Sequence, residues 1–101
     1  MSGDNPESYN EVEQLIDAVT DFSDAMENRL VEKHAEGYRG WDSAEEVCED
    51  LPDGTKRLSG IDNFVNGLFH SATKAEWVDV ANWAMFLWNL ELMQKEADDE
   101  R

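Results

Sequence analysis

Helix-start signals constrain the fold of this chain more than any other feature of its sequence. At three places a hydroxyl side chain stands three residues ahead of a Glu, which is the pattern of a capping box at a helix N-terminus. The pairs are Ser8 with Glu11, Ser43 with Glu46, and Thr73 with Glu76. No apolar run alternates with polar residues, and no Asn-Gly turn joins two such runs. The sequence therefore predicts an all-α fold.

Apolar residues at three- and four-residue spacing predict where the helices lie. The first helix is predicted over residues 11–33, where one continuous stripe holds Val12, Leu15, Ile16, Val19, Phe22, Met26 and Leu30. The later elements are a loop with two Gly (34–42), a short helix (43–50), a turn (51–54), a helix (61–70) and a last helix (73–94). The expected fold is thus a small bundle of about four helices.

The chain is long enough for one hydrophobic core and too short for two. We therefore expect a single helical domain over residues 8–94. The predicted termini are a disordered segment over residues 1–7 and a frayed acidic segment over residues 95–101.

The last predicted helix has two different faces. One is uniformly apolar and is expected to form the core: Trp77, Val80, Ala81, Ala84, Leu87 and Trp88. The other mixes carboxylates, amides and aromatic rings: Glu76, Asp79, Asn82, Asn89, Trp83 and Phe86. A mixed face suits either a subunit interface or a ligand pocket. Because four Trp exceed what a small monomer easily buries, we expect a homo-oligomer, formed through this mixed face or through the stripe of the first helix.

The chain is strongly acidic, with 24 Asp and Glu against 8 Lys and Arg and a net charge of −16. Such a surface repels nucleic acid and anionic lipid headgroups, so neither nucleic acid nor a membrane is expected as a partner. Three interpretations of the acidity stay open. They are adaptation to a halophilic, high-salt cytoplasm, mimicry of DNA by a small inhibitor, and a carboxylate cage for divalent cations.

Cysteine usage and the opening residues indicate the compartment. Cys48 is alone, so no internal disulfide forms, and the first residues lack the basic start and apolar run of a signal peptide. The most apolar stretch, residues 77–93, contains Asp79 and Glu91 and is expected to be a core helix and not a membrane span. We expect a cytoplasmic protein, in the host cytoplasm if it is viral.

The residues themselves suggest binding of a divalent metal ion through oxygen ligands. One Cys and two distant His supply neither a nucleophilic triad nor a closed zinc site. Glu76 and Asp79, three apart on a helix, project to one side and could hold Mg²⁺ or Mn²⁺. The alternative is structural: Glu76 completes a capping box with Thr73, and Asp79 favours the positive end of the helix.

A resemblance to a known family also points to Glu76 and Asp79. The stretch Glu76-Trp-Val-Asp-Val-Ala-Asn-Trp-Ala-Met85 resembles the E-x-x-D-V-A-N-x-A-M signature of MazG-like nucleoside triphosphate pyrophosphohydrolases. Met26-Glu-Asn-Arg-Leu30 and Gly37-Tyr-Arg-Gly-Trp41 are similar to the M-x-x-K-L and H-K-G-G-W segment of short phage and archaeal members. The order and approximate spacing match over residues 26–92. The D-V-A-N-x-A-M match is moderately specific, whereas the Gly-Trp match is weak by itself.

The resemblance implies an all-α, dimeric or tetrameric enzyme in which carboxylates from two helices bind Mg²⁺. The metal activates water against the α–β phosphoanhydride of a nucleoside triphosphate. On this chain the resemblance implies metal-ligand roles for Glu76 and Asp79 and a place near the substrate for Asn82. The predicted substrate-binding residues also include His34, Trp41 and Trp83.

This chain departs from the family pattern at the second metal-binding helix. When the E-E-x-x-E motif of that helix is aligned with the third predicted helix of this chain, Ser59, Gly60 and Asn63 stand in place of the three Glu. The same spacing occurs earlier in the sequence, at Glu45, Glu46 and Glu49. Either that cluster is the displaced motif, or the carboxylates are lost and the cluster is a solvated helix face.

Two classes of function are therefore open. With an intact metal site, the protein is a Mg²⁺- or Mn²⁺-dependent pyrophosphohydrolase of a (deoxy)nucleoside triphosphate. Without one, it is a catalytically degraded relative that binds nucleotide, or a non-catalytic acidic interaction protein such as a viral or mobile-element accessory factor.

Overall fold

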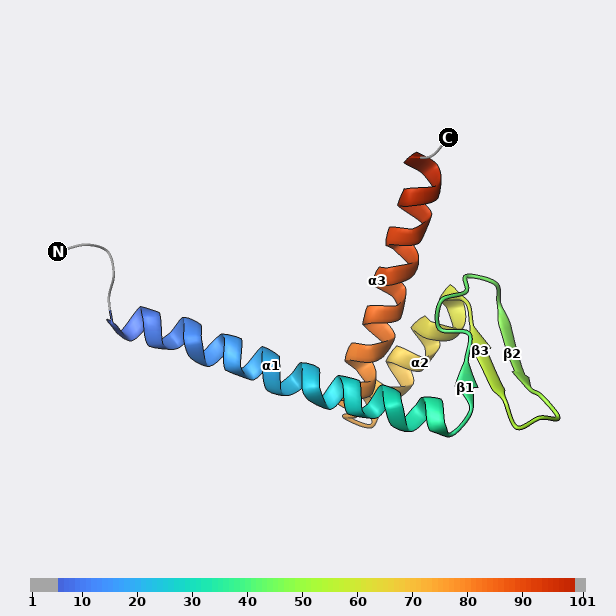
Figure 1. Cartoon of the computed structure of the whole chain (residues 1–101), viewed down its shortest axis with the longest axis horizontal. Helices are drawn as coiled ribbons and strands as arrows, with labels where there is room; N and C mark the ends of the chain where they lie inside the picture. The colour runs from blue at the N-terminus through green and yellow to red at the C-terminus, as the bar shows by residue number, and fades with distance from the viewer. Residues whose placement is uncertain (1–5, 100–101) are drawn as a thin grey trace.

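The computed structural model describes residues 6–99 of the chain. Helices and short strands follow one another in the order α1 (Pro6–Ala35), β1 (Tyr38–Arg39), β2 (Val47–Asp50), β3 (Lys56–Ser59), α2 (Ile61–Thr73) and α3 (Trp77–Asp99) (Figure 1). Of the predicted termini, residues 1–5 and 100–101 lie outside the described residues. The described part of both is helical, since α1 begins at Pro6 and α3 continues to Asp99. Proline suits a first helical turn because its fixed φ is already helical.

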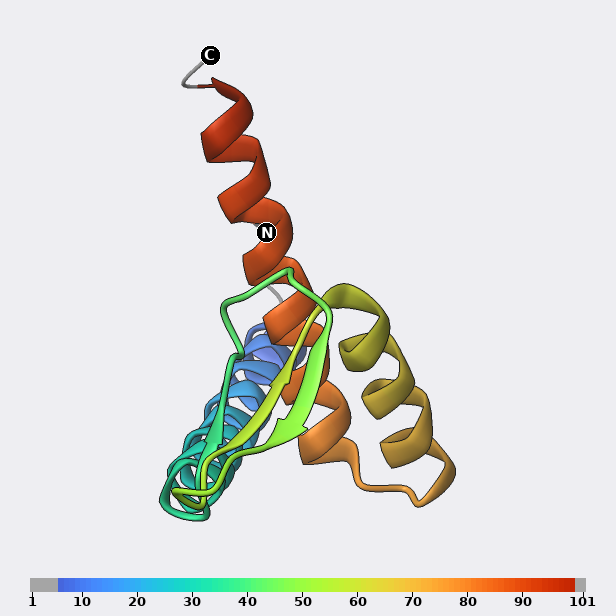
Figure 2. The same ribbon diagram turned by 90° about the vertical axis from the view of Figure 1, so that its right-hand side faces the viewer.

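The prediction of an all-α, four-helix bundle is wrong, because residues 38–59 form a three-stranded sheet. The strand order is β1-β3-β2, with β1 parallel and β2 antiparallel to β3 (Figure 2). The helix predicted over residues 43–50 does not form. The Ser43 hydroxyl accepts a hydrogen bond from the backbone N–H of Glu45 at 3.2 Å, two residues on, which makes a turn instead of a helix cap. Val47–Asp50 then pair with β3.

The turn predicted at residues 51–54 is present, and it closes the β2–β3 hairpin. The Leu51 N–H donates to the Thr55 carbonyl at 2.8 Å, and the Gly54 N–H donates to the Leu51 carbonyl at 3.0 Å. Gly54 has a φ of 89°, which glycine adopts without strain. The Thr55 N–H also donates to the Asp53 carboxylate at 2.9 Å, and this hydrogen bond holds the pKa of Asp53 below its ordinary value. The hydrogen bonds of this turn, more than the strand propensity of the residues, therefore determine where the β2–β3 hairpin forms.

The core lies where α3 packs between α1 and α2 (Figure 2). Phe64 on α2 is fully buried, and Leu90 on α3 is 6% exposed. The Phe64 ring lies 5.7 Å from the ring of Trp83 and 5.5 Å from that of Phe86, centroid to centroid. Trp83 and Phe86 meet edge to face at 5.8 Å, an arrangement that the aromatic quadrupoles favour. The mixed face of the last helix is therefore the face that packs inside the subunit.

The prediction that Trp77 and Trp88 lie in the core is wrong for the single subunit. Their side chains are 59% and 62% exposed, and Leu92 on the same side is 38% exposed. Asn82 and Leu90, on the opposite side, are buried. Both sides of α3 carry large apolar residues, so the helical period alone does not decide which side is covered.

The two halves of α1 have different surroundings. In the C-terminal half, Met26 and Leu30 are partly buried beside α3, and the Nδ2 of Asn82 donates to the Met26 carbonyl at 3.3 Å. The N-terminal half projects away from the other elements (Figure 1), and the subunit measures 65 × 38 × 23 Å along its principal axes. Among residues 6–99, no helix combines the length and the apolar character needed to cross a membrane.

Gly67 allows α2 to approach the aromatic cluster. A Cβ at Gly67 would lie 2.6 Å from Cε2 and 2.7 Å from Cζ2 of the Trp83 ring. That ring is held in place, because its Nε1 donates to the Ser71 hydroxyl at 3.2 Å. We expect Gly67→Ala to lower the free energy of unfolding by about 1–2 kcal/mol, since overpacking outweighs a helix-propensity gain of about 1 kcal/mol.

Urea-induced unfolding measures this effect. The matched control is Asn66→Ala, an exposed neighbour on the same helix, which should be neutral or slightly stabilising. A gain in stability of the same size from both substitutions would show that the Trp83 ring has room for the methyl group.

Candidate functional site

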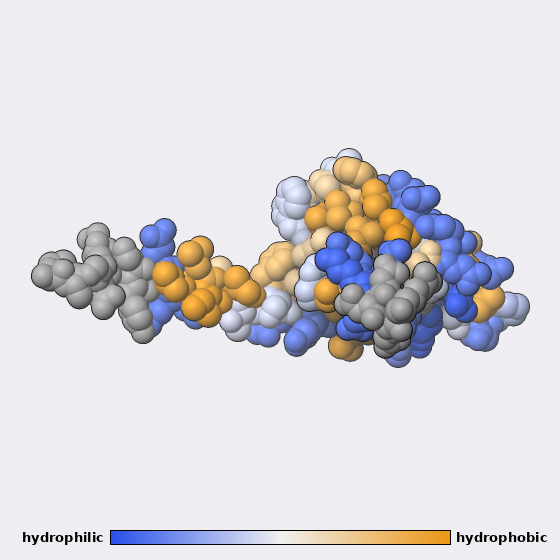
Figure 3. Space-filling view, turned by 90° about the horizontal axis from the view of Figure 1, so that it is seen from above, coloured by the Kyte–Doolittle hydropathy of each residue, from blue (hydrophilic) through white to orange (hydrophobic). Residues whose placement is uncertain are grey.

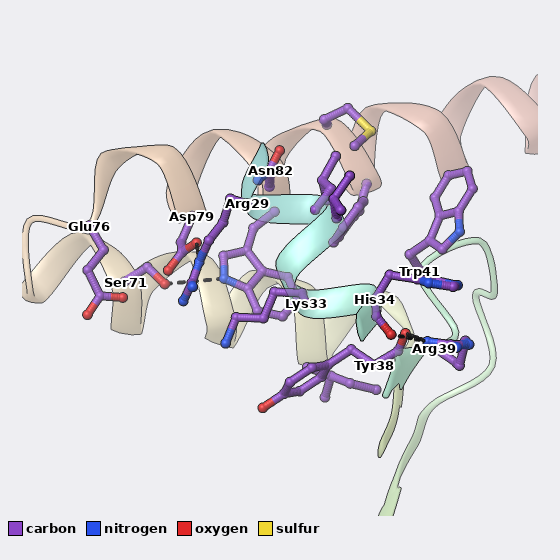
Figure 4. Close-up of a pocket in the computed structure, with 16 residues that line it drawn as sticks. Arg29, Lys33, His34, Tyr38, Arg39, Trp41, Ser71, Glu76, Asp79 and Asn82 are labelled. Carbon is purple, nitrogen blue, oxygen red and sulfur yellow. Dashed lines mark hydrogen bonds and ion pairs between the residues drawn. The ribbon is translucent and has the colours of Figure 1, made fainter. Parts of the chain in front are cut away.

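A pocket of about 690 Å³ lies between the C-terminal half of α1, β1 and the first half of α3 (Figure 4). All four predicted substrate-binding residues line it: His34, Trp41, Asn82 and Trp83. Two of the predicted metal ligands, Glu76 and Asp79, line it as well. The volume is within the range of about 300–1,000 Å³ that is typical of small-molecule sites. The structure thus brings together residues that come from three separate segments.

Asp79 is paired with a cation from the facing helix. The Nε of Arg29 donates to the Oδ1 of Asp79 at 3.0 Å, and the Nη1 of Arg29 donates to the Oε2 of Glu32 at 3.0 Å. These hydrogen bonds, first the one to Asp79 and then the one to Glu32, raise the pKa of Arg29 above its ordinary value. The Asp79 side chain is only 18% exposed, so its negative charge is largely balanced by Arg29.

Glu76 lies at the start of α3, but the capping box predicted there does not form. Thr73 belongs to the end of α2, where its hydroxyl donates to the His70 carbonyl at 2.7 Å. The Glu76 N–H instead donates to the Ser71 carbonyl at 2.9 Å, and the Glu76 carbonyl accepts the Val80 N–H at 3.0 Å. Glu76 itself is exposed, so its side chain lies at the open end of the pocket.

Glu45, Glu46 and Glu49 do not line the pocket. Glu46 caps α2 from a distance in sequence, because its carboxylate accepts the backbone N–H groups of Asp62 at 2.9 Å and Asn63 at 3.4 Å. A carboxylate at this position satisfies free N–H groups and favours the positive end of the helix dipole. Glu49 is exposed on β2. The alternative interpretation, in which Glu45, Glu46 and Glu49 form a solvated helix face, is wrong because residues 45–49 do not form a helix.

The carboxylates do not assemble into the metal site that the resemblance implies. Among residues 6–99, no group of three or more His, Cys, Asp or Glu side chains is placed to hold a metal ion. Glu46 is committed to α2 and Asp79 to Arg29. A Mg²⁺ centre for phosphoryl chemistry needs several carboxylate oxygens at one point. The residues present therefore do not fit this group.

The end of the pocket opposite Glu76 carries positive charge and aromatic rings. Its residues are His34, Tyr38, Arg39 and Trp41. Figure 4 shows Glu76 and Asp79 toward one end, Arg39 and Trp41 toward the other, and Lys33 between them. The Nζ of Lys33 lies 4.8 Å, and that of Lys56 5.2 Å, from the centroid of the Tyr38 ring. A chain with few basic residues thus concentrates several of them here.

The cations of this pocket were not among the residues predicted from the sequence. Arg29 and Lys33 are four residues apart, which puts them on one side of α1, and Arg39 follows on β1. They are also the first Lys and Arg residues of the chain. That clustering of basic residues in an acidic sequence is the signal that could have identified them.

Asn82 is buried with one polar atom unpartnered. Its side chain is 5% exposed, and its Nδ2 donates to the carbonyl of Met26. Its Oδ1 is the buried side-chain oxygen within residues 6–99 that has no hydrogen-bond partner. Leaving such an acceptor unpaired costs about 1–3 kcal/mol. Because this oxygen has almost no solvent-accessible area, a ligand in the pocket does not reach it in this structure.

No family model, no curated protein and no solved structure matches this chain. The likeness to MazG-like enzymes rests on the motifs in residues 26–92 and stays a prediction. The geometry does not identify a family, but it defines a class of protein. This class is a helical subunit with a small mixed sheet and a pocket that has an acidic end and a basic, aromatic end.

Proposed function

We propose that this protein binds a nucleoside triphosphate in the pocket and does not hydrolyse it, as a catalytically degraded relative of the MazG-like pyrophosphohydrolases. The observation that supports it is the pocket of about 690 Å³ in which Lys33, Arg39 and Trp41 come together. A nucleoside triphosphate offers the matching chemistry. Its phosphates and its flat base match the cations and the rings of the same pocket.

Lys33 and Arg39 are assigned to the phosphates. The Nη1 of Arg39 donates to the carbonyls of His34 and Tyr38 at 2.8 Å, and its other guanidinium N–H groups are the ones assigned here. Charge-assisted hydrogen bonds from ammonium and guanidinium groups to phosphate oxygens are among the strongest in proteins. Lys33 has one salt-bridge partner, Glu36 at 3.4 Å, and that carboxylate is half exposed. Arg29 is already bonded to Asp79 and Glu32, so its role in this proposal is to hold the pocket wall.

Trp41 and Phe86 are assigned to the base. Their ring centroids are 5.9 Å apart with a tilt of 39°, and Trp41 is still 46% exposed. A base stacked on Trp41 would cover this apolar surface. Stacking of a base on an aromatic side chain contributes about 1–3 kcal/mol and tolerates different bases.

Titration of the protein with the common ribo- and deoxyribonucleoside triphosphates, followed by calorimetry and tryptophan fluorescence, tests the proposal. Lys33→Gln should weaken binding about tenfold, because a charged hydrogen bond contributes about 1.5 kcal/mol or more. The matched control is Lys95→Gln, since Lys95 also pairs with a helix neighbour, Glu91 at 3.6 Å, but lies outside the pocket. The affinity of the Lys95→Gln variant for the triphosphates should equal that of the wild type. The salt must be high enough to keep the protein folded.

Two results would contradict this proposal. One is the absence of binding for every triphosphate tested. The other is release of pyrophosphate in the presence of Mg²⁺ or Mn²⁺ that disappears in Asp79→Asn, which would restore the enzyme interpretation.

We also propose that copies of the chain associate through the outer stripe of α3. The outer stripe is defined as Trp77, Ala81, Ala84, Trp88 and Leu92. These residues repeat at three- and four-residue steps, as at helix–helix seams, and its large members are exposed in the single subunit. Contiguous exposed apolar surface of this kind is typical of an interface.

The free, exposed thiol of Cys48 suits a reducing compartment, and we propose the cytoplasm.

A further inference from the structure

The apolar stripe of α1 continues beyond the body of the subunit. Its outer part, here called the projecting stripe, consists of Val12, Leu15, Ile16, Val19 and Phe22, which are 39–68% exposed. Its inner part continues through Met26 and Leu30 into the contact with α3. Figure 3 shows apolar side chains along the projecting half of α1. Phe22 lies beside the start of α3, whereas the four earlier residues of the stripe are more than half exposed.

This half of α1 is short of stabilising contacts. An isolated helix is marginal in water because helix formation needs a costly nucleus and gains most of its stability from packing. Glu13, Asp17 and Asp21 follow one another at four-residue steps and are exposed. Like charges at this spacing destabilise a helix. A partner that covers the projecting stripe would supply the packing that this half of α1 lacks.

We propose that the projecting stripe binds an amphipathic helix of another protein whose apolar face is flanked by Lys or Arg. Between Glu11 and Asn28 the helix holds Asp and Glu but no Lys, Arg or His. The helical period places Glu11 along one edge of the projecting stripe and Glu27 along the other. A second copy of α1 would bring charges of the same sign to these edges, whereas a basic helix brings the opposite sign.

A helix is the partner element that fits this surface. The backbone N–H and C=O groups inside α1 are already paired within the helix, so no edge is open for an added strand. Side chains at three- and four-residue steps form ridges that pack into the grooves of another helix. Anionic partners such as nucleic acid and acidic lipid surfaces are repelled by the same carboxylates.

The probe is a synthetic amphipathic helix of about 20 residues with Leu on its apolar face and Lys along both edges, labelled for fluorescence anisotropy. A second peptide carries Glu in place of every Lys. The full chain should bind the Lys peptide at least about tenfold more tightly than the Glu peptide, and added salt should weaken this binding because it screens the attraction. Equal binding of the two peptides, or no binding of the Lys peptide, overturns the proposal.

Three variants locate the binding surface. Val19→Asp should lower the affinity for the Lys peptide at least about tenfold, whereas Gln14→Asp, which adds the same charge on the opposite side of the helix, should leave it within about twofold. The double substitution Glu11→Lys with Glu27→Lys leaves the apolar residues in place. It should shift the preference toward the Glu peptide, and an unchanged preference overturns the proposal even if Val19→Asp perturbs the helix.

The mass of the protein alone tests the competing occupant, a second copy of the chain. Light scattering after size-exclusion chromatography should give the same mass for the wild type and for Val19→Asp. A lower mass for Val19→Asp would show that the projecting stripe is filled by self-association and overturns the proposal. The outcome does not depend on nucleotide binding, because the projecting stripe lies outside the pocket.

Discussion

Truncation of Phe64 to Ala is expected to cost about 3–5 kcal/mol of unfolding free energy, the range for removing a buried Phe. Phe64 is the fully buried aromatic residue to which both Trp83 and Phe86 pack. A domain of this size has only about 5–15 kcal/mol of total stability, and the buried apolar core here is small. We therefore expect a clearly lower melting temperature and a lower urea midpoint, both followed by circular dichroism.

The matched control is Phe69→Ala on the same helix. Phe69 is 64% exposed, so the same atoms are removed with little loss of packing, and the cost should be below about 1 kcal/mol. A similar loss from the two substitutions would mean that Phe69 is covered in solution. A small loss from Phe64→Ala would contradict the placement of the core.

Substitution of Trp88 by Asp is expected to dissociate the oligomer. The Trp88 side chain is 62% exposed in the single subunit, and it lies at the centre of the outer stripe. A carboxylate buried at an apolar interface without a partner is strongly unfavourable. The mass measured by light scattering should fall from that of an oligomer to that of one chain, with helix content retained.

Gln94→Asp is the control for this experiment, because it adds the same charge to α3 outside the outer stripe. It should leave the mass of the oligomer unchanged. A wild-type protein that is already a single chain would reject the interface. So would an oligomer that persists in Trp88→Asp.

The helical part of the fold could be predicted from the sequence, whereas the sheet could not. The apolar period of α1 and α2 and the length of α3 are local properties of consecutive residues, so pattern reasoning locates them. The strands are two to four residues long, too short to show alternation. Their pairing joins residues far apart, such as Tyr38 with Lys56, and depends on backbone turns at glycine. Gly37 is one of these, with a φ of 103° and with the Gly54 carbonyl 2.6 Å from where a Cβ would stand.

The candidate site was predicted in part. His34, Trp41, Asn82 and Trp83 do line one pocket, although their roles there stay predictions. The cations Lys33 and Arg39 were missed because their neighbours in sequence give no hint that α1 and β1 face α3. The acidic cluster at residues 45–49 lies elsewhere, and Glu46 has a structural role as the cap of α2.

By itself, the sequence determined the positions of the long helices and the acidity of the surface, since both depend only on the order and the number of residues. Only the tertiary structure decided which side of α3 is buried. Both sides of this helix carry tryptophan and other apolar residues, so their transfer from water is similarly favourable. The choice depends on shape, because the Phe64 ring and Gly67 of α2 fit against Trp83 and Phe86, and this close packing leaves Trp77 and Trp88 on the outside.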